Sequence, residues 1–211
     1  MTYDATMSMR QARDVYFAEN GFGEDGGYND PWVNFKIGPV PLPFPNTEGR
    51  LRAVRYHDLH HVLTGYHTDY LGELEIAAWE LGAGCKDFYA AWHLNLGGAG
   101  SGALFIPRRT FRAFVRGRRS ESLYGAPLEQ LLDTTVGEAR RRVETEESPA
   151  DATDVALFAA VAVSGLILGT ATLFVVLPLV PIGLGIAAIR RWTTRSETAK
   201  VTSSRPGASQ A

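Results

Sequence analysis

A long uncharged segment near the C-terminal end is the strongest constraint on how this chain can fold. Residues 155–189 contain no Asp, Glu, Lys or Arg. A helix of about 20 apolar residues is long enough to cross a bilayer, so the run can hold at least one. Pro178 and Pro181 predict that a first helix ends near Leu177, because proline lacks an N–H donor and clashes with the preceding turn. We therefore expect a membrane-associated segment over residues 155–192.

Basic residues flank this segment on both sides. Residues 140–142 are three consecutive arginines, and the residues after the segment include Arg190, Arg191, Arg195 and Lys200. Lys and Arg concentrate on the cytoplasmic side of membrane proteins, so both ends are predicted to lie inside. This favours a hairpin that bends between Ser164 and Pro181 over a single crossing. It also predicts a membrane location with the preceding domain on the cytoplasmic side.

The rest of the chain is predicted to be all-α. We expect a helical metal-binding domain over residues 1–143, an acidic linker over 144–154 and a disordered Ser/Thr/Ala-rich tail over 193–211. A net charge of −2 offers no basic surplus for phosphate contacts, so no nucleic-acid partner is expected. The single cysteine, Cys85, cannot form an internal disulfide, and we interpret it as a small residue near a helix end.

Capping residues and glycines predict where the helices begin and end. Thr47 and Gly65 bound one predicted helix, and a second begins at Thr68 or Asp69 and ends at Gly82 to Gly84. Further helices are expected over 10–18, over 88–96, from Pro107 onward and over 123–143. The glycine cluster at 97–102 is predicted to end the helix over 88–96. Residues 21–30 are predicted to be loop, and the proline-rich stretch 39–45 to be extended.

Three of the five histidines lie within residues 57–61. The predicted helix places His57, Asp58 and His61 on the side of its apolar stripe, whereas His60 points about 100° away from His61. Glu73 follows in the first turns of the next helix, where Gly72 would allow a close approach of the two helices. That geometry can bring Glu73 across from His61.

These side chains predict a divalent-metal site formed by His57, Asp58, His61 and Glu73. Two histidines and two carboxylates could hold zinc, which we expect first. Two histidines and one carboxylate could instead hold ferrous iron and leave positions open for oxygen or substrate. A core in which His and Asp only hydrogen-bond to one another is the plain alternative. It would require partners, because unpaired burial costs several kcal/mol.

A histidine box of a membrane di-iron hydroxylase, His57-x-x-His60-His61, is a further alternative. Such sites need several boxes, and only His67 and His93 remain in the chain. His60 also lies on the wrong helix face, so this interpretation fails.

The spacing His-Asp-x-x-His, eleven residues, then Glu resembles the metal-ligand motif of the ubiquinone (coenzyme Q) biosynthesis protein Coq-four family. His57, Asp58, His61 and Glu73 match each of its positions. The resemblance covers about residues 10–143. Flanking stretches agree with it: Arg55-Tyr56, Tyr70-Leu71-Gly72-Glu73-Leu74, Phe114-Val115-Arg116-Gly117-Arg118-Arg119 and Pro127-Leu128-Glu129-Gln130-Leu131-Leu132.

The resemblance implies a helical, membrane-associated protein that binds a prenylated quinone precursor. It implies either oxidative C1 decarboxylation of a prenylated 4-hydroxybenzoate-type precursor, which is a lyase activity, or a non-catalytic lipid-binding scaffold for other quinone-biosynthesis enzymes. Tyr56, Tyr66 and His67 are candidates to support the ligands. The apolar segment departs from the mostly peripheral family, and we interpret it as an anchor. An arginine stripe from Arg108 to Arg119 either contacts anionic lipid headgroups or is a solvated helix face.

Overall fold

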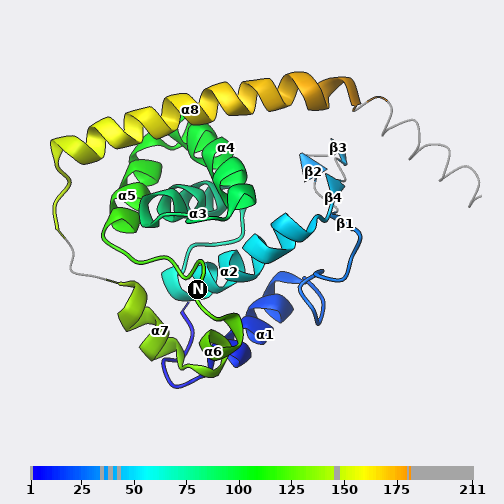
Figure 1. The fold of residues 1–211 in the computed structure, drawn as a ribbon, viewed down its shortest axis with the longest axis vertical. Helices are drawn as coiled ribbons and strands as arrows, with labels where there is room; N and C mark the ends of the chain where they lie inside the picture. Colours follow the sequence, from blue (N-terminus) through cyan, green and yellow to red (C-terminus); the bar gives the residue numbers. More distant parts are fainter. Residues whose placement is uncertain are drawn as a thin grey trace, which may run out of the picture. The chain divides into compact units, whose positions relative to one another are not determined.

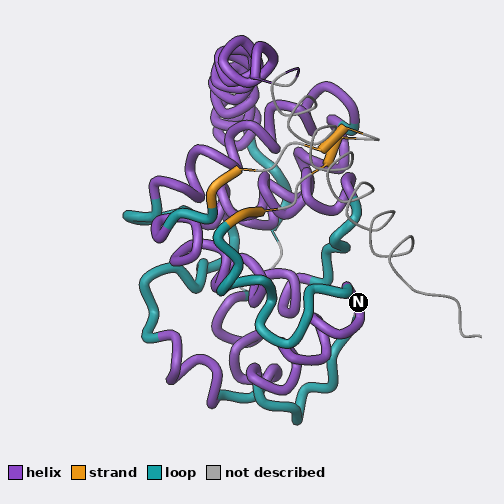
Figure 2. Tube along the Cα trace, turned by 90° about the vertical axis from the view of Figure 1, so that its right-hand side faces the viewer, coloured by secondary structure: helices purple, strands orange, loops and turns teal. Residues whose placement is uncertain are grey.

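The computed structural model describes residues 2–33, 36–37, 40–41, 44–144, 148–179 and 181, and these are mostly helical (Figures 1 and 2). The helices are α1 (Met9–Asn20), α2 (Glu48–Thr64), α3 (Tyr70–Ala83), α4 (Tyr89–Phe105), α5 (Pro107–Arg118), α6 (Leu128–Asp133), α7 (Val136–Val143), α8 (Ala152–Val176) and the 3-10 helix η1 (Leu177–Leu179). The strands are β1 (Trp32–Val33), β2 (Lys36–Ile37), β3 (Val40–Pro41) and β4 (Phe44–Pro45), and β2 pairs antiparallel with β3. The predicted helical fold is confirmed in this coarse form.

Local capping explains why α2 and α3 begin and end where they do. The Thr47 side chain accepts the backbone N–H of Arg50, and Gly65 ends α2 in the left-handed conformation with a φ of 77°. The Asp69 side chain likewise accepts the N–H of Gly72 at the start of α3. Ser, Thr, Asp and Asn satisfy the free N–H groups of a first helical turn in this way. The predicted bounds of both helices are confirmed.

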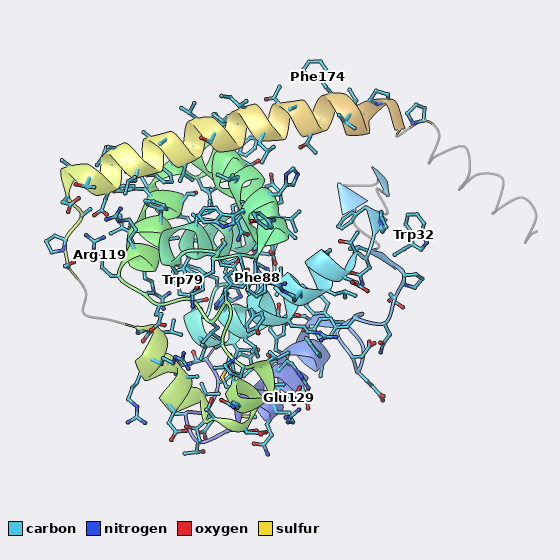
Figure 3. The ribbon with its side chains drawn as sticks, viewed as in Figure 1. Trp32, Trp79, Phe88, Arg119, Glu129 and Phe174 are labelled. Atoms are coloured by element: carbon cyan, nitrogen blue, oxygen red, sulfur yellow. The ribbon has the colours of Figure 1, made fainter. Side chains whose placement is uncertain are left out.

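Helix α3 packs against α4 and α5, and its fully buried Trp79 lies within this part of the core (Figures 1 and 3). The α3–α5 approach requires glycine. A Cβ atom added to Gly117 would lie 2.1 Å from the Trp79 carbonyl oxygen, and one added to Gly82 would lie 2.3 Å from the Phe114 carbonyl oxygen. The two backbones therefore touch, which fixes the position of α3 and of the side chains that it carries.

The prediction that the glycine cluster ends a helix at residue 96 is wrong, because α4 continues to Phe105. Each glycine costs a helix roughly 1 kcal/mol relative to alanine. Here the glycines permit close contacts that larger residues would block. A Cβ on Gly98 would lie 2.7 Å from the Cβ of Ala77, and one on Gly102 would lie 2.6 Å from the hydroxyl of Thr110. Tertiary packing thus outweighs the intrinsic preference.

The helical region predicted over 123–143 is divided into α6 and α7. Thr135 begins α7 with a capping box, in which its side chain accepts the N–H of Glu138 and the Glu138 carboxylate accepts the N–H of Thr135. A capping box at this point starts a new helix. Gly125, with a φ of 78°, forms a turn before α6.

Helix α8 is long and apolar enough to cross a membrane, with a mean hydropathy of 2.1 over an 18-residue window within Ala152–Val175. It ends at Val176, as the prolines predicted, and is unbroken from Ser164 onward, so the bend of a hairpin would have to lie beyond it. Residues 148–171 belong to the same compact unit as α1 to α7. Residues 182–211, which include the rest of the predicted segment and the predicted tail, lie outside the described part. The hairpin and the domain boundaries stay predictions.

Candidate metal centre

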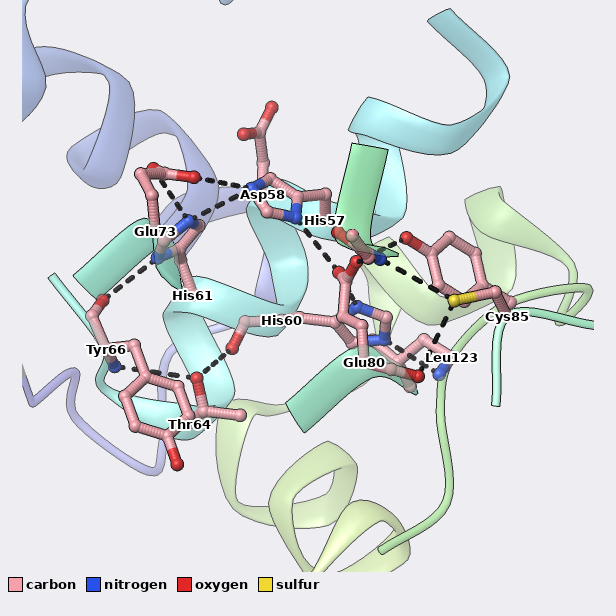
Figure 4. A network of polar contacts seen from close by, with 12 residues as sticks. His57, Asp58, His60, His61, Thr64, Tyr66, Glu73, Glu80, Cys85 and Leu123 are labelled. Carbon is pink, nitrogen blue, oxygen red and sulfur yellow. Dashed lines mark hydrogen bonds and ion pairs between the residues drawn. The ribbon is translucent and has the colours of Figure 1, made fainter. Parts of the chain in front are cut away.

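Three side chains from two helices converge on one point (Figure 4). His57 and His61 lie one turn apart on α2, and their Nε2 atoms are 3.2 Å from each other. Glu73 approaches from α3, with its carboxylate oxygens 3.3 Å from the Nε2 atom of His57 and 3.3 Å from that of His61. The prediction that Glu73 lies across from His61 is confirmed.

The opposite edges of the two imidazole rings determine their tautomers. The Nδ1 atom of His61 lies 2.9 Å from the Tyr66 carbonyl oxygen, which can only accept a hydrogen bond. The Nδ1 atom of His57 lies 3.0 Å from Oε1 of Glu80, an ionised carboxylate that also only accepts. Both Nδ1 atoms therefore carry hydrogen, and each Nε2 atom faces Glu73, with a lone pair in the uncharged ring or as a donor to the carboxylate in the protonated ring.

In the uncharged rings, two nitrogen lone pairs and a carboxylate lie around one point, and a metal ion or a proton there would offset their repulsion. Metal-binding histidines commonly donate their second N–H to a carboxylate or a backbone carbonyl, as His57 and His61 do here. The donor set thus fits a divalent metal. A proton shared among the same atoms is the competing occupant, so metal binding would release a proton.

The charge balance of the group appears in its pKa values. Burial alone would raise the pKa of Glu73, but hydrogen bonds from His57 and His61 outweigh it and lower the pKa to about 2. Burial alone would lower the pKa of His57, but Glu80 and Glu73 outweigh it and hold the pKa well above its usual range. Glu73 is therefore a carboxylate at neutral pH and draws positive charge to the site.

Sequence reasoning missed Glu80, which links the site to the core. Its side chain is fully buried on α3. Oε1 accepts hydrogen bonds from His57 and His60, and Oε2 accepts them from Asn95 on α4 and from the hydroxyl of Tyr124. Burial would raise the pKa of Glu80, but its histidine partners hold it well below the usual range. The signal in the sequence was a lone carboxylate in an apolar stretch, seven residues after Glu73 and hence on the same helix face.

His60 lies outside the metal group, as predicted, but the prediction that it faces away from the core is wrong, because its ring is fully buried. Its Nε2 atom accepts the backbone N–H of Leu123 at 2.9 Å, and its Nδ1 atom donates to Glu80 at 2.7 Å. The ring is fully buried against Trp79, and burial lowers its pKa. A neutral, doubly hydrogen-bonded core histidine is the result, so the plain structural alternative holds for His60.

Asp58 is not among the three side chains that converge. Its Oδ2 atom accepts a 2.6 Å hydrogen bond from Tyr28 in the loop after α1, and Tyr16 of α1 lies 3.5 Å from Oδ1. Burial raises the pKa of this carboxyl. The contacts with Tyr28 and Tyr16 connect α2 to the N-terminal part of the chain. The role of Asp58 as a metal ligand stays a prediction.

The residues proposed to support the ligands have different roles. Tyr66 holds His61 through its backbone carbonyl, whereas the Tyr56 hydroxyl donates to the carbonyl of Ala126 at 2.7 Å, away from the metal group. His67 contributes its backbone: a Cβ on Gly72 would lie 2.0 Å from the His67 carbonyl oxygen. Gly72 thus permits a tight turn between the helices rather than the predicted contact of their backbones.

Cys85 is a buried residue just after the end of α3, as predicted. Asn95 lies 3.6 Å from its sulfur, and burial raises the pKa of the thiol to about 12. A thiol with so high a pKa is not a nucleophile at neutral pH. We therefore assign it a packing role beside the Glu80 network.

The metal group is partly open to solvent. The side chain of Glu73 is 43% exposed and that of His57 is 21% exposed, whereas His61 is covered. Catalytic zinc sites keep a position open beside three protein ligands, and two histidines with one carboxylate also bind ferrous iron. The arrangement can hold a metal that still reaches an outside ligand, and it does not identify the metal.

No known protein family, curated protein or solved structure matches this chain. Its function must therefore be inferred from the geometry of the site, from the apolar helix and from the motif that the sequence carries.

Proposed function

We propose that this chain is a metal-dependent enzyme of ubiquinone biosynthesis, a lyase that acts at the membrane on a prenylated 4-hydroxybenzoate-type precursor by oxidative C1 decarboxylation. The observation that supports it most is the convergence of His57, His61 and Glu73 on one partly exposed point. The spacing of these residues, with Asp58, matches the motif of the Coq-four family. Helix α8 would keep the site close to a substrate whose isoprenoid tail lies in the bilayer.

The surrounding residues explain why such a site would need its metal. Asp58, Glu73 and Glu80 are three carboxyl groups near the two histidines, and the positive charge that Glu80 and Glu73 favour on His57 offsets only part of theirs, so the protein alone offers little attraction for an anionic benzoate. A bound divalent metal would supply the Lewis-acid charge that polarises the substrate carboxylate or phenolate. Glu80 and the Tyr66 carbonyl keep the two rings oriented, and Glu73 is the most exposed of the three side chains.

The identity of the metal bears on the reaction. Zinc, our first expectation, has no redox chemistry, whereas ferrous sites with two histidines and one carboxylate activate oxygen. Metal analysis of the purified protein would therefore also inform the mechanism. Zinc alone would require an oxidant bound elsewhere.

A non-catalytic scaffold that organises other quinone-biosynthesis enzymes is the second candidate. One observation favours it. A cavity of about 710 Å³ is lined by the arginine face of α5, with Tyr66, Glu75 and Glu144 among its other residues, and none of the three metal ligands lines it. In the scaffold the metal would fix α2 to α3.

Quinone intermediates in a deletion strain separate the two candidates. The strain would be complemented with the wild-type chain, with Glu73→Gln or with the control Glu129→Gln, a carboxylate of α6 paired with Arg10 outside the metal group. Accumulation of a C1-carboxylated precursor with Glu73→Gln alone supports the enzyme. Loss of several biosynthetic enzymes from the membrane supports the scaffold. Full rescue by Glu73→Gln would contradict a role for the metal.

A further inference from the structure

Helix α8 packs lengthwise on the helical domain over its first half (Figure 1). A Cβ on Gly165 would lie 2.1 Å from the Leu96 carbonyl oxygen of α4, so the two backbones touch there. The ring of Phe158 lies 5.3 Å from that of Phe111 and 5.6 Å from that of Phe114, both on α5. These contacts place one stripe of α8 on α4 and α5.

An ion-pair cluster fixes the start of α8. Asp154 is fully buried and binds Arg119 through two hydrogen bonds, and it lies 2.8 Å from the guanidinium of Arg118. Figure 3 labels Arg119 beside the N-terminal end of α8. Asp154, Phe158 and Gly165 recur at helical spacing, so the ion pairs, the ring contacts and the glycine contact lie along one side of the helix.

The position of the glycine contact limits how α8 can meet a bilayer. Within the residues that the structure describes, α8 continues beyond Gly165 over 166–176, which extend about 16 Å at roughly 1.5 Å per residue. A bilayer core is about 30 Å thick. An upright α8 would therefore pull α4 and the arginine-rich α5 into the hydrocarbon, where each arginine costs several kcal/mol.

The opposite side of α8 is apolar and uncovered. Val163 is 57% exposed and Ile167 is 67% exposed, and at about 100° per residue both lie opposite the docked stripe, together with Ala156. On α4, Leu104 is 61% exposed and lies about 40° around the helix from Gly100, the residue that touches Gly165. The free face of α8 is therefore apolar, and α4 carries a further exposed apolar side chain, Leu104.

We propose that α8 lies in the plane of the membrane surface, with its free face among the acyl chains of one leaflet, and does not cross the bilayer as a single span. The absence of any charged side chain over residues 155–189 favours lipid as the occupant of this surface. Ordinary interfacial helices keep a charged face in water. In α8, helices α4 and α5 cover the face that an ordinary interfacial helix exposes to water. The helical domain is therefore held against the bilayer.

Depth measurements on the full-length protein test this orientation. Single cysteines at Ala156, Val163 and Ile167 would carry spin labels in vesicles of phosphatidylcholine and phosphatidylglycerol, with collisions by oxygen and by a nickel chelate reporting depth. The buried native Cys85, whose pKa is raised to about 12, should stay unlabelled. We expect the three labels to lie at one depth. A difference of about 16 Å between Ala156 and Ile167 would indicate an upright helix and overturn the proposal.

Two glycines on the same helix supply the matched variants. Gly165→Leu should force α8 away from Leu96 and change the equal depths into a gradient, whereas Gly169→Leu meets nothing within 4 Å and should leave them equal. Three further results would contradict the proposal. The two variants could change the label depths equally, or all labels could be accessible to the nickel chelate in water. The labels could also be shielded from both oxygen and the chelate, as they would be in contact with another protein.

Discussion

Replacing Glu80 by glutamine tests whether this buried carboxylate supports the metal group through His57. Glutamine keeps the size of the side chain and can remake its hydrogen bonds. Its oxygen would face the two Nδ1–H donors of His57 and His60, and its amide would face Asn95 and Tyr124, which can both present an oxygen. The fold should therefore survive, and the change removes chiefly the negative charge.

The expected effect follows from the difference between charged and neutral hydrogen bonds. A hydrogen bond to a charged group contributes about 1.5–3 kcal/mol and a neutral one about 0.5–1.5 kcal/mol, so the bond from His57 to residue 80 loses roughly 1–1.5 kcal/mol. Since about 1.4 kcal/mol is tenfold in affinity, the dissociation constant for zinc should rise roughly tenfold. Losses of 10- to 100-fold are typical when the hydrogen-bond partner of a ligand is changed.

Competition with a chromophoric chelator would measure the zinc affinity, and circular dichroism would confirm the fold. Glu75→Gln is the control, because it makes the same change on the same helix at an ion pair with Arg109 outside the metal group. Its effect on metal affinity should be negligible. A folded Glu80→Gln variant that binds zinc as tightly as the wild type would refute the reasoning.

Other predictions concern the connections around the site. Gly72→Ala should destabilise the fold by about 1–3 kcal/mol, because its Cβ would lie 2.0 Å from a backbone oxygen. Gly49→Ala in α2 should stabilise the fold by about 0.4–1 kcal/mol, because its Cβ would have no atom within 4 Å. Thermal unfolding of the two variants measures both effects. Asp58→Asn should retain zinc affinity within a few-fold, and a hundredfold loss would identify Asp58 as a ligand. In the native protein, Cys85 should not react with a thiol reagent at neutral pH, because it is buried. Rapid labelling of Cys85 would contradict its burial.

Much of α2 and α3 could be predicted from the sequence because their signals are local. Thr47, Gly65 and Asp69 contact backbone groups within about one turn of their own position, so their capping roles can be predicted from the neighbouring residues alone. The helix periodicity also separated His60 from His57 and His61. That separation depends on the 100° step alone, and no tertiary information is needed.

Long-range contacts explain what the sequence analysis missed. The glycines of α4 would weaken an isolated helix, and only the close approach of Ala77, Thr110 and Gly165 explains why the helix continues. Glu80 has the same character, since its four partners come from α2, α4 and the segment before α6. A buried carboxylate needs such partners, but the sequence does not say which residues supply them.

The metal content of the purified protein tests the central claim most directly. We expect one divalent ion per chain in the wild type, loss of that ion in His61→Ala and in Glu73→Gln, and full retention in His93→Ala, which changes an exposed histidine outside the group. Glu73 is partly exposed, so its variant should stay folded even if His61→Ala does not. A wild-type protein without stoichiometric metal, or a folded Glu73→Gln that keeps all of it, would contradict the account.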